Sequence, residues 1–206
     1  TVISTQEKLQ DLGFPESMRR VILSGIKLRH FIISLISFLV LISCGGTDNI
    51  TVNPRPIASD GGTAKEREMA GLIRGHPKQK RRTLLYNTRL TLVARARARD
   101  MARRNYFGHV DPDGYGPNWH LTRAGYRLPI EWTAFKNSNQ VESILGGKAT
   151  AKEAFHTLVN SSGHRSHLLA AAPFYANHLR YGVGYAYNPA STYHHYWVII
   201  TAPIQK

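Results

Sequence analysis

Two histidines of the sequence lie where a helical pattern meets a turn, a place where a side chain can be held in position for chemistry. His109 follows a long helical pattern and precedes the Asp-Pro-Asp-Gly segment at 111–114. Pro fixes one backbone dihedral of such a turn and Gly permits a positive one. His164 follows a second helical pattern that ends at 160–163. A lone histidine at such a boundary is more often a hydrogen-bonded structural residue than a ligand, so each of the two needs a partner.

Other polar residues near these positions are weaker candidates. Ser161 and Ser162 precede His164 and could suggest a serine nucleophile, but neighbours in sequence seldom reach the geometry that nucleophilic catalysis requires. We expect Ser162 to cap a helix. His194 and His195 are adjacent in an expected strand. Their side chains would point to opposite faces, and we interpret them as surface residues.

Cys44 is the only cysteine, so no disulfide can form within the chain. Basic residues at 19, 20, 27 and 29 precede an apolar run from Phe31 to Ile42, which has the length of a signal-peptide core and is short for a membrane span. The segment Leu41-Ile42-Ser43-Cys44 resembles the bacterial lipobox. We therefore expect Cys44 to be lipidated; the alternative is an N-terminal membrane helix with a chance cysteine at its end.

This interpretation divides the chain into four parts. Residues 1–17 lack methionine and precede Met18, so we interpret them as an upstream extension that is absent from the mature protein. Residues 18–43 would form a lipoprotein signal peptide, and residues 44–63, rich in Gly, Pro, Asp and Asn, a flexible tether. Residues 64–206 would form the folded domain. The predicted location is the cell envelope, at an outer membrane or the cell surface.

The composition, with 42% hydrophobic and 19% charged residues, suits one globular domain with extra segments. The net charge is +14, and removal of residues 1–43 leaves 22 basic and 10 acidic residues, a net charge of +12. Such a surface attracts lipid headgroups or acidic envelope polymers. We expect no nucleic-acid binding, because the basic stretches lack interleaved aromatic residues. Most of the arginines at 95, 97, 99, 103 and 104 are expected on a solvated helix face.

Periodicity predicts a mixed α+β domain. Apolar residues at helical spacing predict a short helix that ends near Gly75 and a longer helix from Leu90 to Ala102. Thr150 and Glu153 indicate a capping box at the start of a further helix. Two strands, at 181–187 and 196–201, are expected to pair as an antiparallel hairpin, and the first has a face of glycine and alanine that permits close packing.

Several motifs in one order resemble the CAP superfamily, the cysteine-rich secretory, antigen 5 and pathogenesis-related group, in its cysteine-poor bacterial branch. The resemblance covers about residues 66–203, and it implies a three-layer αβα sandwich with a central antiparallel sheet. The motifs are Ala-Arg-Asp-Met-Ala (98–102), Tyr-Phe-Gly-His (106–109), Asp-Pro-Asp-Gly (111–114), Arg-Ala-Gly-Tyr (123–126), Glu142, Ser-Ser-Gly-His-Arg (161–165) and Tyr-Gly-Val-Gly-Tyr (181–185).

The resemblance also implies a central groove with two histidines and two acidic residues. By position, these are His109, His164 and Glu142, while Ser161 occupies the second acidic position and leaves the set incomplete. Two imidazoles and one carboxylate form a plausible site for zinc or another divalent metal. The alternative is a buried polar network that joins the helices to the sheet. Ser161, Arg165 and His167 are expected to line the groove, and His167 could add a third nitrogen ligand.

Two functions are consistent with such a domain. The first, which we favour, is a non-enzymatic, membrane-anchored binding module whose groove takes a lipid, glycan or peptide and whose metal is modulatory. The second is a metal-assisted hydrolase of envelope or extracellular polymers, with Glu142 as the candidate catalytic base. Turnover that depends on metal and on Glu142 would distinguish the second from the first.

Overall fold

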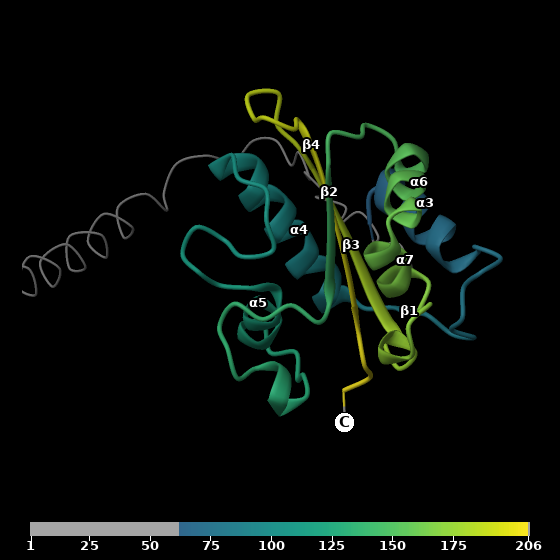
Figure 1. The fold of residues 1–206 in the computed structure, drawn as a ribbon. Coiled ribbons are helices and arrows are strands. Elements are labelled where there is room, and N and C mark those ends of the chain that lie inside the picture. The colour runs from purple at the N-terminus through teal and green to yellow at the C-terminus, as the bar shows by residue number, and fades with distance from the viewer. Residues whose placement is uncertain (1–61, 206) are drawn as a thin grey trace, which may run out of the picture. The chain divides into compact units, whose positions relative to one another are not determined.

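A four-stranded sheet with the order β1-β3-β4-β2 organises residues 62–205, the part of the chain that the computed structural model describes (Figure 1). The strands are β1 (Leu85–Tyr86), β2 (Glu142–Gly146), β3 (Arg180–Tyr187) and β4 (His195–Ala202). β4 pairs antiparallel with both β2 and β3, and the short β1 pairs parallel with β3. The predicted hairpin is therefore confirmed.

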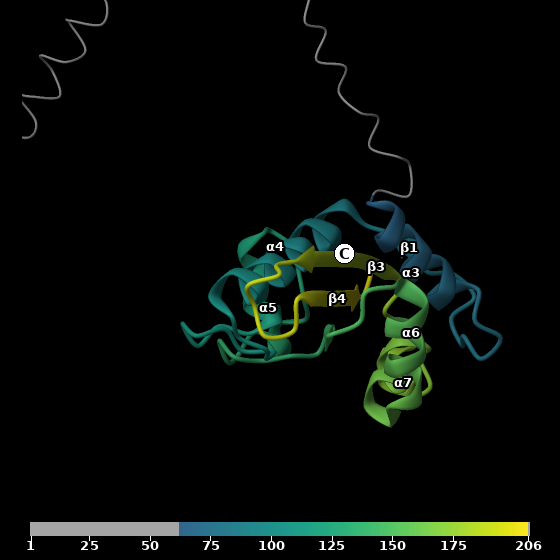
Figure 2. The ribbon, with the colours of Figure 1, turned by 90° about the horizontal axis from the view of Figure 1, so that it is seen from above.

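Helices cover both faces of this sheet, which gives the three predicted layers (Figures 1 and 2). One face carries α4 (Thr88–Arg104) and α5 (Pro117–Arg123). The other face carries α3 (Ala64–Arg74), α6 (Ala151–Asn160) and α7 (Ser162–Leu168). Two 3-10 turns, η1 (Ile130–Trp132) and η2 (Pro173–Tyr175), complete the described part.

β4 separates two hydrophobic cores because successive side chains of a strand point to opposite faces. Tyr196, Val198 and Ile200 pack with α4 and α5, whereas Trp197 and Ile199 pack with α3, α6 and α7. All five side chains are fully buried. The central strand therefore fixes the distance between the two helical layers.

Glycines let α4 lie directly on β3. A Cβ atom on Gly182 would lie 2.3 Å from the backbone nitrogen of Thr91, and one on Gly184 would lie 2.3 Å from the carbonyl carbon of Ala94. Real side chains do not tolerate such distances, so the bare face predicted for this strand is the contact surface for α4. This contact fixes the position of α4, the helix that carries Arg97 of the candidate site described below.

The helix start predicted at Thr150 is present, because the hydroxyl of Thr150 accepts a hydrogen bond from the backbone N–H of Glu153 at α6. In addition, Thr63 and Glu66 form a complete capping box at α3 that was not predicted. The expectation that Ser162 caps a helix was wrong. Ser161 is the N-cap of α7 and Ser162 is its first helical residue, because α6 ends at Asn160 and leaves a single residue between the two helices.

The predicted signal peptide, Cys44 and most of the tether lie outside the described residues. Of the helices formed within residues 62–205, none has the length and apolar character needed to span a membrane.

Candidate functional site

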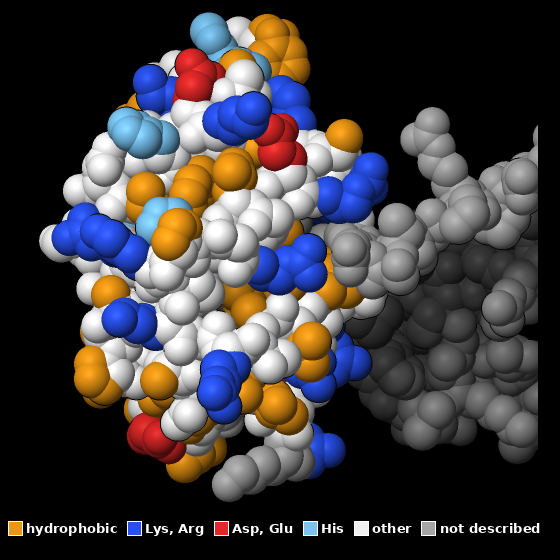
Figure 3. All heavy atoms as spheres, turned by 90° about the vertical axis from the view of Figure 1, so that its right-hand side faces the viewer, with side chains coloured by type: hydrophobic (Ala, Val, Ile, Leu, Met, Phe, Trp, Pro, Cys, Tyr) orange, Lys and Arg blue, Asp and Glu red, His pale blue; other side chains and the backbone are white. Residues whose placement is uncertain are grey.

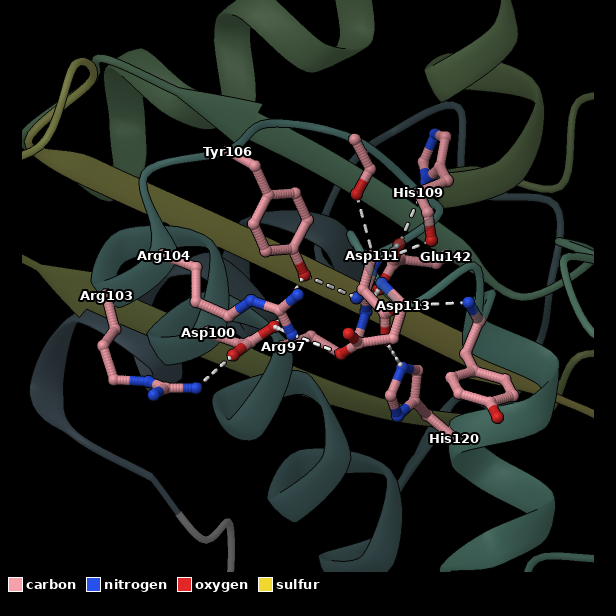
Figure 4. Close-up of polar contacts among 12 residues, drawn as sticks. Arg97, Asp100, Arg103, Arg104, Tyr106, His109, Asp111, Asp113, His120 and Glu142 are labelled. Carbon is pink, nitrogen blue, oxygen red and sulfur yellow. Dashed lines mark hydrogen bonds and ion pairs between the residues drawn. The ribbon is translucent and has the colours of Figure 1, made fainter.

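Arg97, Glu142 and His109 form a charged cluster between α4 and the sheet (Figure 4). Nε of Arg97 lies 3.2 Å from Oε2 of Glu142, and Nδ1 of His109 lies 2.9 Å from Oε1 of the same carboxylate. Arg97 is 2% exposed and Glu142 is 6% exposed. Both carboxylate oxygens are therefore engaged by positively charged or hydrogen-bonding nitrogens of the protein.

The electrostatics of Arg97 reflect this enclosure. Burial alone lowers the pKa of a guanidinium, but the charge and hydrogen bond of Glu142 outweigh burial and raise the pKa of Arg97. Arg97 also donates to the hydroxyl of Tyr106 at 2.8 Å and to the carbonyls of Gly108 and His109 at 3.1 and 2.7 Å. The guanidinium thus fixes the loop that carries His109 as well as the carboxylate that His109 contacts.

Arg97 is an exception to the solvated face that we expected for most of the arginines at 95, 97, 99, 103 and 104. Its position carried the relevant signal, since it lies seven residues after Leu90 and four before Met101, both fully buried on the apolar stripe of α4. Because arginine is charged, it was not counted as part of the apolar stripe. A buried arginine needs hydrogen-bond acceptors, and an opposite charge is the strongest of them. Glu142 supplies that charge from a strand 45 residues away in sequence.

Local hydrogen bonds set Glu142 at the start of β2. The side-chain oxygen of Asn139 accepts from the backbone N–H of Glu142 at 2.9 Å and from that of Val141 at 3.2 Å. The side-chain amide of Asn139 also donates to the backbone carbonyl of Glu142 at 3.2 Å. These contacts orient the carboxylate toward α4, so its position does not depend on a ligand.

The aspartate turn predicted after His109 is present and adds a second polar group beside Arg97. The carboxylate of Asp111 accepts from the backbone N–H groups of Asp113 and Tyr115, and its second oxygen lies 2.8 Å from Nε2 of His120. Although burial alone raises the pKa of Asp111, these hydrogen bonds outweigh it and lower that pKa. Gly114 adopts a φ of 85°, as the turn requires.

His164 provides the second imidazole. Its Nδ1 is buried without a hydrogen-bond partner in the described part of the chain. Burial lowers the pKa of His164, and the nearby His109 lowers it further. The ring is therefore neutral near pH 7, and one of its nitrogens can either remain unsatisfied, at a cost of about 1–3 kcal/mol, or bind a ligand.

The two imidazoles lie near enough for His109 to lower the pKa of His164. Glu142 engages Nδ1 of His109 and leaves Nε2 as the second nitrogen of a ring that is 39% exposed. A carboxylate behind a histidine fixes the ring and its tautomer in many metal sites. Within residues 62–205, no three His, Cys, Asp or Glu side chains are grouped closely enough to share one ion. Glu142 thus makes a supporting contact to His109, and its expected position as a direct metal ligand stays a prediction.

The remaining predicted site residues are exposed or hydrogen-bond to other parts of the domain. Ser161 is exposed at the junction of α6 and α7, and Arg165 donates to the carbonyl of Val159 at 2.9 Å. His167 was expected to line the groove, but it is 3% exposed. Its two ring nitrogens each lie 2.7 Å from a hydroxyl, that of Ser143 on β2 and that of Thr201 on β4. His167 faces the sheet because these two hydroxyls satisfy it there.

A hollow of about 700 Å³ lies between α4 and α5, and Arg97 and Asp111 form part of its wall. The rings of Tyr115 and Trp119 stack at its side with centroids 4.0 Å apart. Pockets of this size accept small organic ligands. Its further lining residues are Leu92, Val93, Ala96, Asp100, Arg104, Asp113, His120, Arg123 and Ala124.

The sequence profile of the CAP family, described as the cysteine-rich secretory protein family, matches residues 63–201. The chain belongs to this family. The CAP domain resembles an extracellular protein of Bacillus anthracis that contains an SCP domain, with a TM-score of 0.52 and 20% identity over 68% of this chain. This chain spans only 40% of that protein.

An outer surface protein of Borrelia burgdorferi is also similar, with a TM-score of 0.48 and 15% identity over 68% of this chain and 89% of that protein. Among curated proteins, no sequence matches this chain. The resemblance to the Bacillus protein supports the same fold, and the function must be argued from the residues of this CAP domain.

Proposed function

We propose that this protein is an extracytoplasmic, membrane-anchored binding module in which His109 and His164 hold a divalent metal ion. The observation that carries this proposal is the engagement of Glu142. Both of its oxygens contact Arg97 or His109, so the carboxylate serves to orient an imidazole. Zinc suits nitrogen donors and would supply a positive charge beside the His109 loop.

The hollow between α4 and α5 is the proposed ligand groove, because Arg97 belongs both to this hollow and to the Glu142–His109 cluster. Most charges in the hollow are paired within the protein. Arg104 contacts Asp113, and Asp111 contacts His120. A lining of apolar and aromatic groups with internally balanced charges suits a lipid, glycan or peptide that binds by shape and apolar contact.

Hydrolysis is the less supported function. A general base must reach the proton it removes, whereas the oxygens of Glu142 are committed to Arg97 and His109.

Purified protein should bind zinc in calorimetry and show no turnover in broad protease and wall-hydrolase assays. His109→Ala should weaken zinc binding, while Ser161→Ala serves as the matched control at an exposed site. Metal-dependent turnover that disappears in Glu142→Ala would refute the binding-module proposal.

Membrane attachment through Cys44 is proposed from the sequence, and family membership is consistent with export. The surface that carries α3 and α6 shows lysine and arginine side chains spread over the face (Figure 3). A dispersed positive charge favours residence near anionic headgroups or envelope polymers. Metabolic labelling with a radioactive fatty acid should mark the wild-type protein and not Cys44→Ala. Label retained in Cys44→Ala would refute this anchor.

A further inference from the structure

A second cavity, of about 530 Å³, lies between η1 and η2 on a different part of the domain from the His109 cluster. Three rings pack together at its wall. The Trp132 and Phe174 centroids are 5.2 Å apart, and His178 lies 5.4 Å from Trp132 and 5.7 Å from Phe174. The C-terminal segment that leads to the end labelled C in Figure 1 completes the cavity with Pro203 and Ile204. The site therefore has a broad aromatic wall.

His178 contributes the one buried side-chain polar atom of this wall that lacks a hydrogen-bond partner in the described residues. Nδ1 of His178 lies 3.0 Å from the backbone carbonyl of Thr201. The hydroxyl of Thr201 also lies 3.0 Å from Nδ1. Because the carbonyl can only accept, we assign the proton to Nδ1, and burial keeps the ring neutral by lowering its pKa to about 4. Nε2 is then a bare acceptor, and it is buried without a hydrogen bond. Nε2 can therefore accept a hydrogen bond from a donor group of a ligand.

The charges around the cavity restrict what that donor can be. Glu131 is the only charged side chain among the lining residues of this cavity, and its carboxylate disfavours an anionic ligand. Arg81 lies behind the wall, donating to the carbonyls of Tyr175 and His167, and its charge contributes to the lowered pKa of His178 after burial. That positive charge disfavours a cationic ligand. A neutral ligand rich in hydroxyl groups satisfies both conditions.

We propose that this cavity binds a neutral pyranose unit of a glycan. The apolar C–H face of the sugar packs on Trp132 and Phe174, whose ring faces are electron-rich. One hydroxyl donates to Nε2 of His178, and others bond to Glu131 and to the side-chain amide of Asn177, both of which line the cavity. The glycan proposal rests on the proposed role of the protein as a binding module and specifies one class of ligand. It does not depend on the proposed metal site.

Access to Nε2 requires one side chain to move. His178 is fully buried, whereas Phe174, which packs against it, is 50% exposed and lies on the three-residue turn η2. A rotation of the Phe174 ring would uncover the imidazole edge without disturbing the Nδ1 bond to Thr201. A hydroxyl of the ligand would then donate a hydrogen bond to Nε2, which has no hydrogen-bond partner while the Phe174 ring packs against His178.

The test uses the full chain labelled with ¹⁵N at its tryptophan indoles, and Trp132→Leu assigns the indole signal of Trp132. The probes are three tetrasaccharides of equal length: cellotetraose, which is neutral, a cationic glucosamine tetramer and an anionic galacturonate tetramer. Cellotetraose should shift the Trp132 signal and bind at least about tenfold more tightly than either charged tetramer. Trp132→Leu and His178→Phe should each weaken binding about tenfold, which calorimetry measures without the indole signal.

Two further variants separate a binding site from a structural cluster. Glu131→Gln should retain cellotetraose binding and improve binding of the anionic tetramer, which a purely structural role would not do. Tyr187→Leu, at an aromatic side chain of β3 that is 57% exposed and lines neither cavity, should leave the response unchanged. The proposal is overturned if cellotetraose causes no shift, if a charged tetramer binds more tightly, or if an apolar octapeptide binds Trp132 where the sugars do not. Zinc binding measured on the same sample reports separately on the His109–His164 proposal.

Discussion

Replacement of Glu142 by alanine tests the buried cluster most severely. The substitution leaves the guanidinium of Arg97, 2% exposed, without its carboxylate, and it frees Nδ1 of His109. Removal of one partner from a buried ion pair costs about 3–5 kcal/mol. With a urea dependence of about 2 kcal/mol per molar, the unfolding midpoint should fall by about 1.5–2.5 M.

Urea unfolding followed by tryptophan fluorescence provides the measurement. Asp113→Ala is the matched control, because Asp113 also pairs with an arginine of α4 but its side chain is 61% exposed. That control should leave the midpoint unchanged within error, since exposed ion pairs contribute little. The double variant Arg97→Met with Glu142→Leu should recover much of the stability lost in Glu142→Ala. If Glu142→Ala is as mild as Asp113→Ala, the cluster does not hold α4 to the sheet as argued.

Three further predictions concern acid, packing and metal. Burial holds the pKa of His178 at about 4. Between about pH 6.5 and 4, the unfolded chain therefore binds a proton that the folded chain does not. The free energy of unfolding should fall by about 3 kcal/mol as the pH is lowered through this range. Urea midpoints measured across this range should decline less in His178→Phe, and a rise in wild-type stability on acidification would contradict the assignment. Gly184→Ala should destabilise the fold by about 3 kcal/mol, because the added Cβ meets the backbone of α4. The control Gly71→Ala, whose Cβ meets open space, should leave the free energy of unfolding unchanged or raise it by about 0.5–1 kcal/mol. Thermal unfolding measures both variants, and equal effects would refute the close contact between α4 and β3. His164→Ala should reduce zinc affinity in calorimetry, and an unchanged affinity would remove His164 from the site.

Most of the fold could be predicted because its signals are local. The stripe from Leu90 on α4, the N-cap Thr150 and the alternation around Gly184 each act within a few residues, and each was found where expected. The three layers were implied by the resemblance to the CAP superfamily. The short parallel strand β1, only two residues long, carries too few side chains to leave a pattern.

The site could be predicted only in part because its contacts join distant segments. His109 and Glu142 were chosen correctly as neighbours in space, and their 2.9 Å contact spans 33 residues. The inward direction of Arg97 was missed because six arginines in one helix suggest a solvated face. His167 could not be placed from the sequence, since the hydroxyls of Ser143 and Thr201 that satisfy it are brought together only by the pairing of strands.

The central claim is that two imidazoles hold the metal while Glu142 orients one of them. The most direct measurement is an anomalous-scattering map from a crystal of the protein soaked in zinc. The account predicts a peak about 2.1 Å from one ring nitrogen each of His109 and His164, with Glu142 still bonded to Arg97 and to Nδ1 of His109. A peak coordinated by Glu142, or zinc bound elsewhere with none at these histidines, would contradict it.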